Sequence, residues 1–376
     1  MTRDNRTEKK QRNIGLDFLK VLAMLMVVTI HTLGHGGVLE ATEPLSANYQ
    51  IAWLLQSFVY CAVDVYVIIT GFLYADREIR FSRIVLLWIM TFFYSAMISI
   101  GLYVLRPYVG FMTVVSGFFP LITKQYWFFN AYFALFCFIP VLNTIAAERR
   151  RLKYVITISF LLFSVLPLLG LQKDLFTTNK GYSFLWFAVL YLCGAYLKKY
   201  GLPEKLQSGR CLLGIYLASA VLLLLSRNIL TLLTEAWLGE PKYAGLFYTY
   251  TSPLVLLPAF SLVALFKDIS IRTRIVHIIV ETLAPYTFGV YLIHDNPNFR
   301  NWIILDRFAP YAGMAPVKMA LCTLATILGI YMCCSLADYI RAKLFTLLSA
   351  EKAAGAIERV ISAYLEIPNK EVSKKC

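Results

Sequence analysis

The stretch that decides the fold is RNIGLDFLKVLAMLMVVTIHTLGH, residues 12–35. It is long enough to cross a bilayer, and it is apolar except for a few ionisable side chains. Lys20 and His31 are separated by three helical turns plus about 20°, so both project from one helix face, roughly 16 Å apart along the axis. Because charged and polar groups are costly in hydrocarbon, this stripe indicates a functional site.

The neighbours of these two residues leave other interpretations open. Asp17 lies three residues before Lys20 and is placed to neutralise part of its charge. Alternatively, Lys20 only reaches the head groups and His31 fills a polar niche between helices. His31 and His35 have the i, i+4 spacing of metal ligands, but the sequence supplies no third ligand, so we predict no metal.

The composition predicts an all-α, polytopic membrane helix bundle. Hydrophobic residues make up 59% of the chain and charged residues only 15%, far from the balance of a soluble domain. Ten apolar runs have about the length of a span, several of them near the short end of the range. They are residues 12–35, 51–75, 84–105, 125–147, 154–171, 182–197, 211–225, 248–266, 276–294 and 314–337.

The basic residues predict the topology. The formal charge is +14, and the lysines and arginines form short clusters between apolar runs, which is typical of cytoplasmic loops and not of a nucleic-acid-binding face. Ten spans with both termini in the cytoplasm place about three quarters of the 36 Lys and Arg residues inside. We therefore expect a basic tail at 1–13, a transmembrane domain at 14–337, and an amphipathic tail with a disordered end at 338–376.

Asp64 interrupts the second apolar run and is expected at a membrane depth similar to that of Lys20. An ion pair between them would keep both charges in the bilayer, although a buried pair also serves simply to fix helix packing. In the same run, Gly71 permits close helix approach.

Two further groups of residues are candidates for binding and catalysis. Arg77, Arg80 and Arg83 would share one face if helical, and such a cluster suits phosphates, although it also fits plain topology. His294 ends the ninth run at the expected height of His31, so the two imidazoles are predicted to share a substrate or a proton. Trp127 lies near the start of the fourth run, where an interfacial aromatic belt also explains it.

These motifs, in this order, resemble the acyltransferase 3 family of bacterial integral-membrane acyltransferases. In that family a basic residue in the first helix precedes a histidine, as Lys20 precedes His31 here. The second-helix motif GVDLFFVLSGFL is similar to AVDVYVIITGFL at residues 62–73, with threonine replacing serine, and lysine replaces the more usual arginine in the first helix. The remaining correspondences are Arg77, Arg80 and Arg83, the aromatic string Tyr126, Trp127 and Phe128, and the late YLIH string with Tyr291 and His294.

The resemblance implies an O-acyltransferase of the bacterial plasma membrane. It would move an acyl group, commonly acetyl from acetyl-CoA, to a hydroxyl of a surface glycan or its lipid-linked precursor. Acyl-CoA is then a substrate, and no tightly bound cofactor is expected. The acceptor and homodimerisation are left open by the sequence.

The expected mechanism uses the whole thickness of the membrane. Cytoplasmic acyl-CoA would place its phosphates near the Arg77, Arg80 and Arg83 cluster and extend its pantetheine arm toward His31, which acts as general base or carries the acyl group. Lys20 and Asp64 would position the donor, and His294 would serve the acceptor side. The alternatives are a transporter or flippase that exports a small acid or a glycan intermediate, and a membrane sensing part of a larger enzyme.

Overall fold

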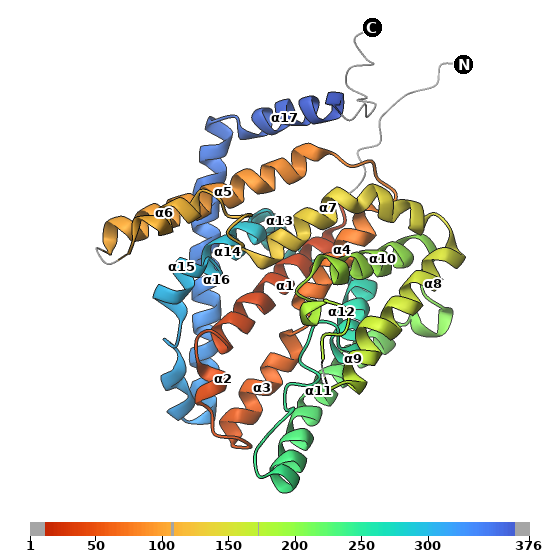
Figure 1. Ribbon diagram of the computed structural model, residues 1–376, viewed down its shortest axis with the longest axis vertical. Coiled ribbons are helices and arrows are strands. Elements are labelled where there is room, and N and C mark those ends of the chain that lie inside the picture. Colours follow the sequence, from red (N-terminus) through yellow and green to blue (C-terminus); the bar gives the residue numbers. More distant parts are fainter. Residues whose placement is uncertain (1–11, 107–108, 172, 365–376) are drawn as a thin grey trace.

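The computed structural model describes residues 12–106, 109–171 and 173–364, and every regular element in these ranges is a helix (Figure 1). Eight segments are long and apolar enough to cross a membrane. They are Ile14–Leu33, Ala47–Tyr74, Phe81–Leu105, Trp127–Ala146, Arg149–Leu169, Gly209–Leu238, Arg274–His294 and Pro316–Leu347. The all-helical membrane bundle predicted from the sequence is confirmed, and residues 1–11 and 365–376, which belong to the tails expected at 1–13 and 338–376, lie outside the described residues.

The ten apolar runs correspond closely to the observed helices. Eight of them coincide with the eight candidate spans, and the other two coincide with shorter helices, α10 with 17 residues and α12 with 14. At the C-terminal end, the last span continues ten residues beyond the predicted boundary, and a separate helix follows it. The division of the chain at residue 337 therefore stays a prediction.

The helices follow one another through short connections. The first eight are α1 (Ile14–Leu33), α2 (Val38–Ala41), α3 (Ala47–Val59), α4 (Ala62–Tyr74), α5 (Phe81–Leu105), α6 (Phe111–Gly117), α7 (Trp127–Ala146) and α8 (Arg149–Phe160). The later ones are α9 (Leu166–Leu169), α10 (Phe184–Tyr200), α11 (Gly209–Leu238), α12 (Pro253–Phe266), α13 (Arg274–Leu283), α14 (Thr287–His294), α15 (Pro297–Phe299), α16 (Pro316–Leu347) and α17 (Ala350–Tyr364). Short π or 3₁₀ turns join some of them, at Leu161–Val165, Asn179–Gly181, Glu204–Leu206, Ala284–Tyr286, Arg300–Ile304 and Ala309–Gly313.

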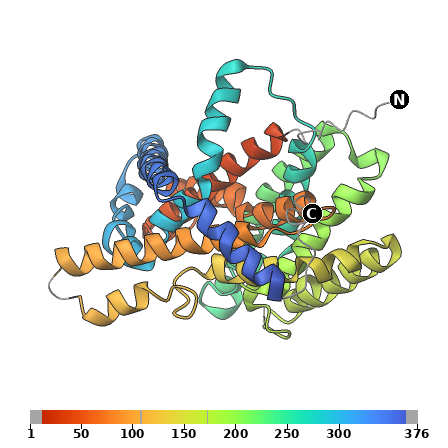
Figure 2. The same ribbon diagram turned by 90° about the horizontal axis from the view of Figure 1, so that it is seen from above.

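Helix α1 lies in the middle of the bundle, packed against α3, α4, α12, α13, α14 and α16. In Figure 1 it descends from the upper half toward α2, whereas α16 ascends past it to α17, which crosses over α5 (Figure 2). The beginning of α1 and the end of α16 therefore lie on the same side of the bundle. Which side of the membrane this is remains a prediction from the basic residues.

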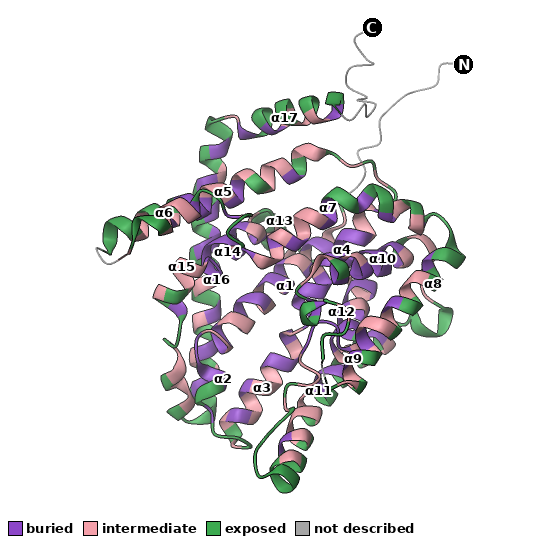
Figure 3. Cartoon of the chain, in the orientation of Figure 1, coloured by how far each residue is buried: buried purple, intermediate pink, exposed green. Residues whose placement is uncertain are grey.

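Buried residues gather on α1, α4, α10 and α14, and exposed residues cover the outer helices (Figure 3). Many of the exposed side chains are large and apolar, such as Leu217 and Leu232 on α11 and Leu324 and Leu328 on α16. A soluble protein would place such side chains against its own core, whereas lipid solvates them. The exposed apolar faces thus agree with a multi-pass membrane protein.

Helices α4 and α10 pack closely along their length, and two glycines make this contact possible. A Cβ atom added at Gly71 would lie 2.0 Å from the carbonyl oxygen of Tyr191, and one added at Gly194 would lie 2.1 Å from that of Ile68. Small residues at such positions let helix backbones touch inside a membrane. The close approach expected at Gly71 is confirmed.

Replacing Gly71 with alanine is expected to destabilise the protein by about 1–3 kcal/mol, because the new methyl group must push two backbones apart. Gly101 provides the matched control, since a Cβ atom there meets nothing within 4 Å. Thermal unfolding in detergent, followed by tryptophan fluorescence, should show a lower midpoint than wild type for Gly71→Ala and an unchanged midpoint for Gly101→Ala. Equal midpoints would contradict the packing argument.

Two spans are broken, and the breaks place polar residues at the level of the bundle interior. The second span divides at Tyr60 and Cys61, so that Asp64 falls in the first turn of α4. The ninth run contains Pro285 in a short 3₁₀ turn, after which α14 ends at His294. Interrupted helices are tolerated in membranes where the broken backbone lines a cavity or packs against protein.

Candidate active site

A cavity of about 1130 Å³ follows α1 from Lys20 to the C-terminal end of the helix. One face of this helix lines it, through Lys20, Met24, Val27, His31 and His35. The spacing of three and four residues is that of a single helical stripe, which extends over about 22 Å. The prediction that Lys20 and His31 share one face of the helix is confirmed, and this face lines the cavity.

The two ends of the cavity differ in charge. Lys20, Arg77 and Arg83 line one end and supply three cations. His31 and His35 line the other end, together with Asp295 and Arg300. The cavity therefore joins a basic mouth, suited to an anionic molecule, to a group of imidazoles that can exchange protons.

His31 is held in a chain of hydrogen bonds that begins on α14. The ring atom Nδ1 of His294 lies 2.6 Å from the carbonyl oxygen of Val290, and its Nε2 lies 2.9 Å from Nδ1 of His31. His294 is fully buried, whereas the side chain of His31 remains 14% exposed. The pairing of these two histidines, which the sequence predicted from their expected height in the membrane, is confirmed.

The partners in this chain determine where the protons lie. A carbonyl oxygen only accepts, so Nδ1 of His294 carries a proton and donates it to Val290. In a neutral His294, Nε2 then holds a lone pair and accepts from Nδ1–H of His31. A neutral His31 consequently has its own lone pair on Nε2, which is the form of imidazole that acts as a base or nucleophile.

Asp295 completes the group and was not anticipated from the sequence. Its Oδ1 lies 3.7 Å from Nδ1 of His31 and accepts a hydrogen bond of 2.8 Å from Arg300. Burial raises the pKa of Asp295, and the nearby His294 and Arg300 oppose that shift. Burial and the charge of Arg300 lower the pKa of His35, which keeps this imidazole neutral. A carboxylate beside Nδ1 stabilises the positive charge that His31 gains when it takes a proton.

The loop after α14 is fixed by Tyr126 and Asn296. The hydroxyl of Tyr126 donates to the carbonyl oxygen of Leu292 at 2.9 Å, and the side-chain amide of Asn296 donates to that hydroxyl at 2.7 Å. Asn296 also caps α15 by accepting from two backbone N–H groups. These bonds hold Asp295 and Arg300 against the end of α1, so the acid and the base come from distant parts of the chain but meet in a rigid frame.

Comparison with known proteins identifies the family of the chain. Residues 13–342 match the family model of acyltransferase 3, described as an acyltransferase domain. The chain belongs to this family. No curated protein and no solved structure matches it. The family resemblance noted in the sequence is thus confirmed, and the molecule is a membrane acyltransferase.

The structure of this acyltransferase corrects the expected role of Asp64. Lys20 pairs with Asp17 at 3.0 Å, as their spacing predicts, and Arg12 pairs with the same carboxylate. Within the described residues, no cation lies within ion-pair distance of Asp64, which instead accepts a hydrogen bond of 3.4 Å from Trp186. Asp64 is fully buried and does not line the cavity. The predicted ion pair between Lys20 and Asp64 is therefore wrong, because a nearer carboxylate is available one helical turn from Lys20.

The arginine cluster is also arranged differently from the expectation. Residues 75–80 form a turn and an extended segment before α5 begins, so the three arginines do not form a helical face. Arg77 and Arg83 nevertheless line the basic mouth, and Arg83 donates to the hydroxyl of Tyr74 at 2.8 Å. Arg80 caps α5 and does not line the cavity.

The two aromatic residues predicted near the substrate both line the cavity. Trp127 stacks against Tyr250, with ring centroids 5.9 Å apart, and lies 4.4 Å from the ring of Tyr182. Tyr291 is buried against Tyr126 and Phe128, and its hydroxyl has no hydrogen-bond partner among the described residues. These rings narrow the middle of the cavity with apolar surface, which suits the uncharged part of an extended substrate.

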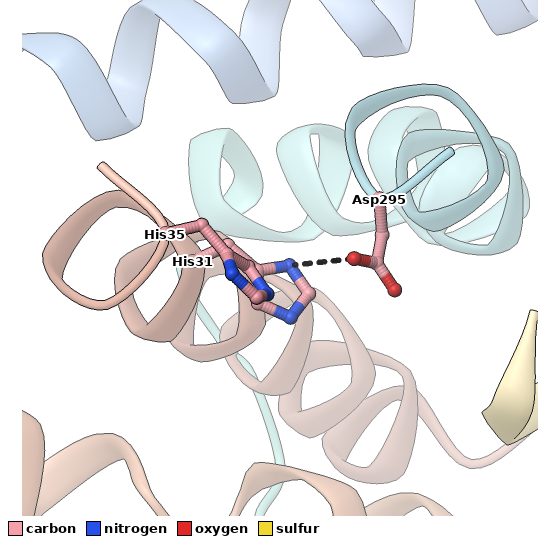
Figure 4. A group of neighbouring side chains, drawn as sticks. All are labelled: His31, His35 and Asp295. Atoms are coloured by element: carbon pink, nitrogen blue, oxygen red, sulfur yellow. Dashed lines mark ion pairs between the residues drawn. The ribbon is translucent and has the colours of Figure 1, made fainter. Parts of the chain in front are cut away.

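His31, His35 and Asp295 also meet the geometric condition for a metal site, since their donor atoms lie within 4.8 Å of one another (Figure 4). The third ligand that the sequence lacked is thus present. However, His31 already uses Nδ1 toward His294, and Arg300 contacts the same carboxylate oxygen that would bind the ion. A guanidinium at that oxygen opposes a divalent cation, so these residues fit a proton relay better than a metal site.

Proposed function

We propose that this acyltransferase transfers an acyl group, acetyl in the simplest case, from cytoplasmic acyl-CoA to a hydroxyl of a surface glycan or its lipid-linked precursor. The observation that carries the proposal is the continuous cavity, with Lys20, Arg77 and Arg83 at one end and His31 at the other. The separation of Lys20 and His31 along α1, about 16 Å, is comparable to the length of the pantetheine arm of coenzyme A. No cofactor beyond this donor is required.

The donor is proposed to enter at the basic mouth. Guanidinium groups bind phosphates in bidentate fashion, and Lys20 adds a point charge deeper in the cavity. The thioester then lies near His31, past the aromatic rings of Trp127 and Tyr291. The predicted topology puts about three quarters of the Lys and Arg residues on the cytoplasmic side together with Lys20, which supports a mouth that faces the cytoplasm of a bacterial plasma membrane, where acyl-CoA is made.

The reaction needs one proton to move twice. The Nε2 lone pair of His31 removes the proton of the acceptor hydroxyl while its oxygen attacks the thioester carbonyl. The C–S bond breaks, and the proton on Nε2 passes to the leaving thiolate, which gives an ester and free coenzyme A. During this cycle Nδ1–H stays bonded to His294, and Asp295 balances the charge on the imidazolium.

The test is acetyl-CoA turnover by the purified protein in lipid nanodiscs, with a glycan acceptor pool, measured as thiol release and acetyl ester formation. Arg83→Gln is expected to raise the KM for acetyl-CoA about tenfold, because it removes a charge-assisted phosphate contact. Arg80→Gln is the matched control: it removes the same charge from the same segment, but Arg80 does not line the cavity.

Two results would contradict the proposal. Equal KM values for the two arginine variants would show that the basic mouth does not bind the phosphates of acetyl-CoA. Wild-type protein that consumes no acetyl-CoA, but moves a small acid or a glycan intermediate across vesicles, would instead support the transporter alternative.

A further inference from the structure

A second group of side chains lines the His31 end of the cavity and takes no part in the proton relay. Trp53 and Gln56 lie on one face of α3, Tyr60 directly follows that helix, and Arg227 packs against Trp53 from α11. Helix α3 begins shortly after α1 ends and packs against it, so the start of α3 lies at the same end of the bundle as His31 and His35. These four residues form the α3 subsite.

Arg227 is the cation of this subsite. Its Nε donates to the hydroxyl of Tyr49 at 2.8 Å, and its guanidinium carbon lies 3.3 Å from the ring centroid of Trp53. Among the described residues, no carboxylate lies within ion-pair distance of Arg227, and the four N–H groups of its two terminal nitrogens have no partner. Arg300, the other arginine at this end, is already paired with Asp295.

Two buried polar atoms of the subsite also lack partners. Gln56 is only 4% exposed, and its Oε1 accepts no hydrogen bond within the described part of the chain. The indole Nε1 of Trp53 is buried and donates none there. Unpaired buried donors and acceptors are costly, and both residues line the cavity. A ligand that supplies one donor and one acceptor, as a sugar hydroxyl pair does, satisfies both.

Two carboxylates share this end of the cavity with Arg227. Glu40 and Asp306 line it as well, but both are exposed, so water and salt screen their charges. The guanidinium is held between three aromatic rings, those of Trp53, Tyr49 and Tyr248. Its charge is therefore less screened, and its planar fork is oriented before any ligand arrives.

We propose that the α3 subsite binds the acceptor, and that this acceptor is a saccharide bearing an oxyanion, either a carboxylate or a phosphate. This inference rests on the proposed function, because it deepens the acceptor side of the same reaction. Arg227 holds the oxyanion through its free N–H groups, while Gln56 and Trp53 bind sugar hydroxyls. The arrangement places the saccharide beside Nε2 of His31 with a hydroxyl available for acylation.

The experiment measures binding and does not depend on turnover. Isothermal titration of the full protein in nanodiscs uses three probes, methyl β-glucuronide, glucose 1-phosphate and methyl β-glucoside. At least one acidic probe is expected to bind about tenfold more tightly than the neutral one. The tighter acidic probe then identifies the oxyanion as a carboxylate of the sugar or as a phosphate at its anomeric carbon.

Variants separate the charge from the hydroxyl contacts. Arg227→Gln should lose the preference for the acidic probe, Arg227→Lys should keep part of it, and Gln56→Leu should weaken all three probes alike, by several-fold. Lys242→Gln is the matched control, since Lys242 pairs with Glu240 after α11 and lies outside the cavity. Thermal unfolding midpoints show whether each variant is folded.

The subsite assignment is overturned if the acidic and neutral probes bind wild-type protein equally, if no acidic probe binds, or if folded Arg227→Gln keeps the preference. None of these results bears on acyl-CoA consumption. Conversely, an absence of acyl-CoA turnover would overturn the proposed function while leaving the binding preference measurable.

Discussion

Replacing His31 with alanine is expected to lower the rate of acyl transfer about 10²- to 10⁴-fold, which is the usual contribution of a general base. The reason is geometric: within the described residues, His31 is the histidine that lines the cavity and has its Nδ1 bound to His294, which leaves the lone pair on Nε2. The measurement is ester formation from acetyl-CoA in nanodiscs at saturating donor. Folding should be preserved, because the side chain is partly exposed in the cavity.

Two variants control this result. His31→Gln keeps the volume and a donor toward His294 but offers no base, so it should be as inactive as alanine. His277→Ala removes a partly exposed histidine that pairs with Glu281 at 3.3 Å, outside the cavity, and should transfer at the wild-type rate. If folded His31→Ala matches the wild type, His31 has no role in the chemistry.

The same preparation distinguishes the two roles considered for His31. A histidine that carries the acyl group becomes labelled when radioactive acetyl-CoA is supplied without acceptor, whereas a general base does not. The relay through His294 favours the base, since it prepares Nε2 to exchange a proton in both directions. Label retained on wild-type protein and lost from His31→Gln would show the carrier role.

The sequence was sufficient to predict the features of the site that follow from helical geometry. Three turns separate Lys20 from His31, so their common face was predictable, and the cavity along α1 confirms it. The level of His294 followed from counting spans, because His294 ends its run and His31 lies near the end of the first run, on the side that the predicted topology makes the same. Gly71 was predictable as a contact because only small residues allow helix backbones to touch.

The rest depends on contacts that local patterns do not encode. Asp295 directly follows His294, and this adjacency was a usable signal, but only the packing of the loop by Tyr126 and Asn296 turns the carboxylate toward α1. The predicted pairing of Asp64 with Lys20 rested only on their similar depth in the membrane, whereas the side chain of Lys20 contacts Asp17 and that of Asp64 contacts Trp186.

The α3 subsite could not be predicted for a related reason. Gln56 and Trp53 resemble ordinary residues of an apolar helix, and their unpaired atoms become visible only when neighbours are in place. Arg227 lies two residues beyond the predicted run 211–225, on the side expected to face outward. A single arginine at such a position is usually no sign of a binding site. Its significance comes from the three rings around it and from the fact that no carboxylate of the described residues lies within ion-pair distance of it.

Replacing His294 with leucine is expected to lower transfer about 10- to 100-fold, because His31 loses the acceptor that holds its proton on Nδ1. Without it, the proton distributes between the two nitrogens and the ring is free to rotate away from the acceptor. His294→Gln should recover much of the rate, since its amide oxygen can occupy the place of Nε2. The effect should appear in kcat and leave the KM for acetyl-CoA nearly unchanged.

A double variant shows whether His294 acts through His31. Residues that work as one unit are not additive, so His31→Ala combined with His294→Leu should be no slower than His31→Ala alone. A further loss in the double variant would mean that His294 contacts the acceptor by itself, which its complete burial opposes. Equal rates, together with recovery by glutamine, would identify His294 as the residue that positions the base, because a merely structural defect would not be repaired by an amide at the same atom.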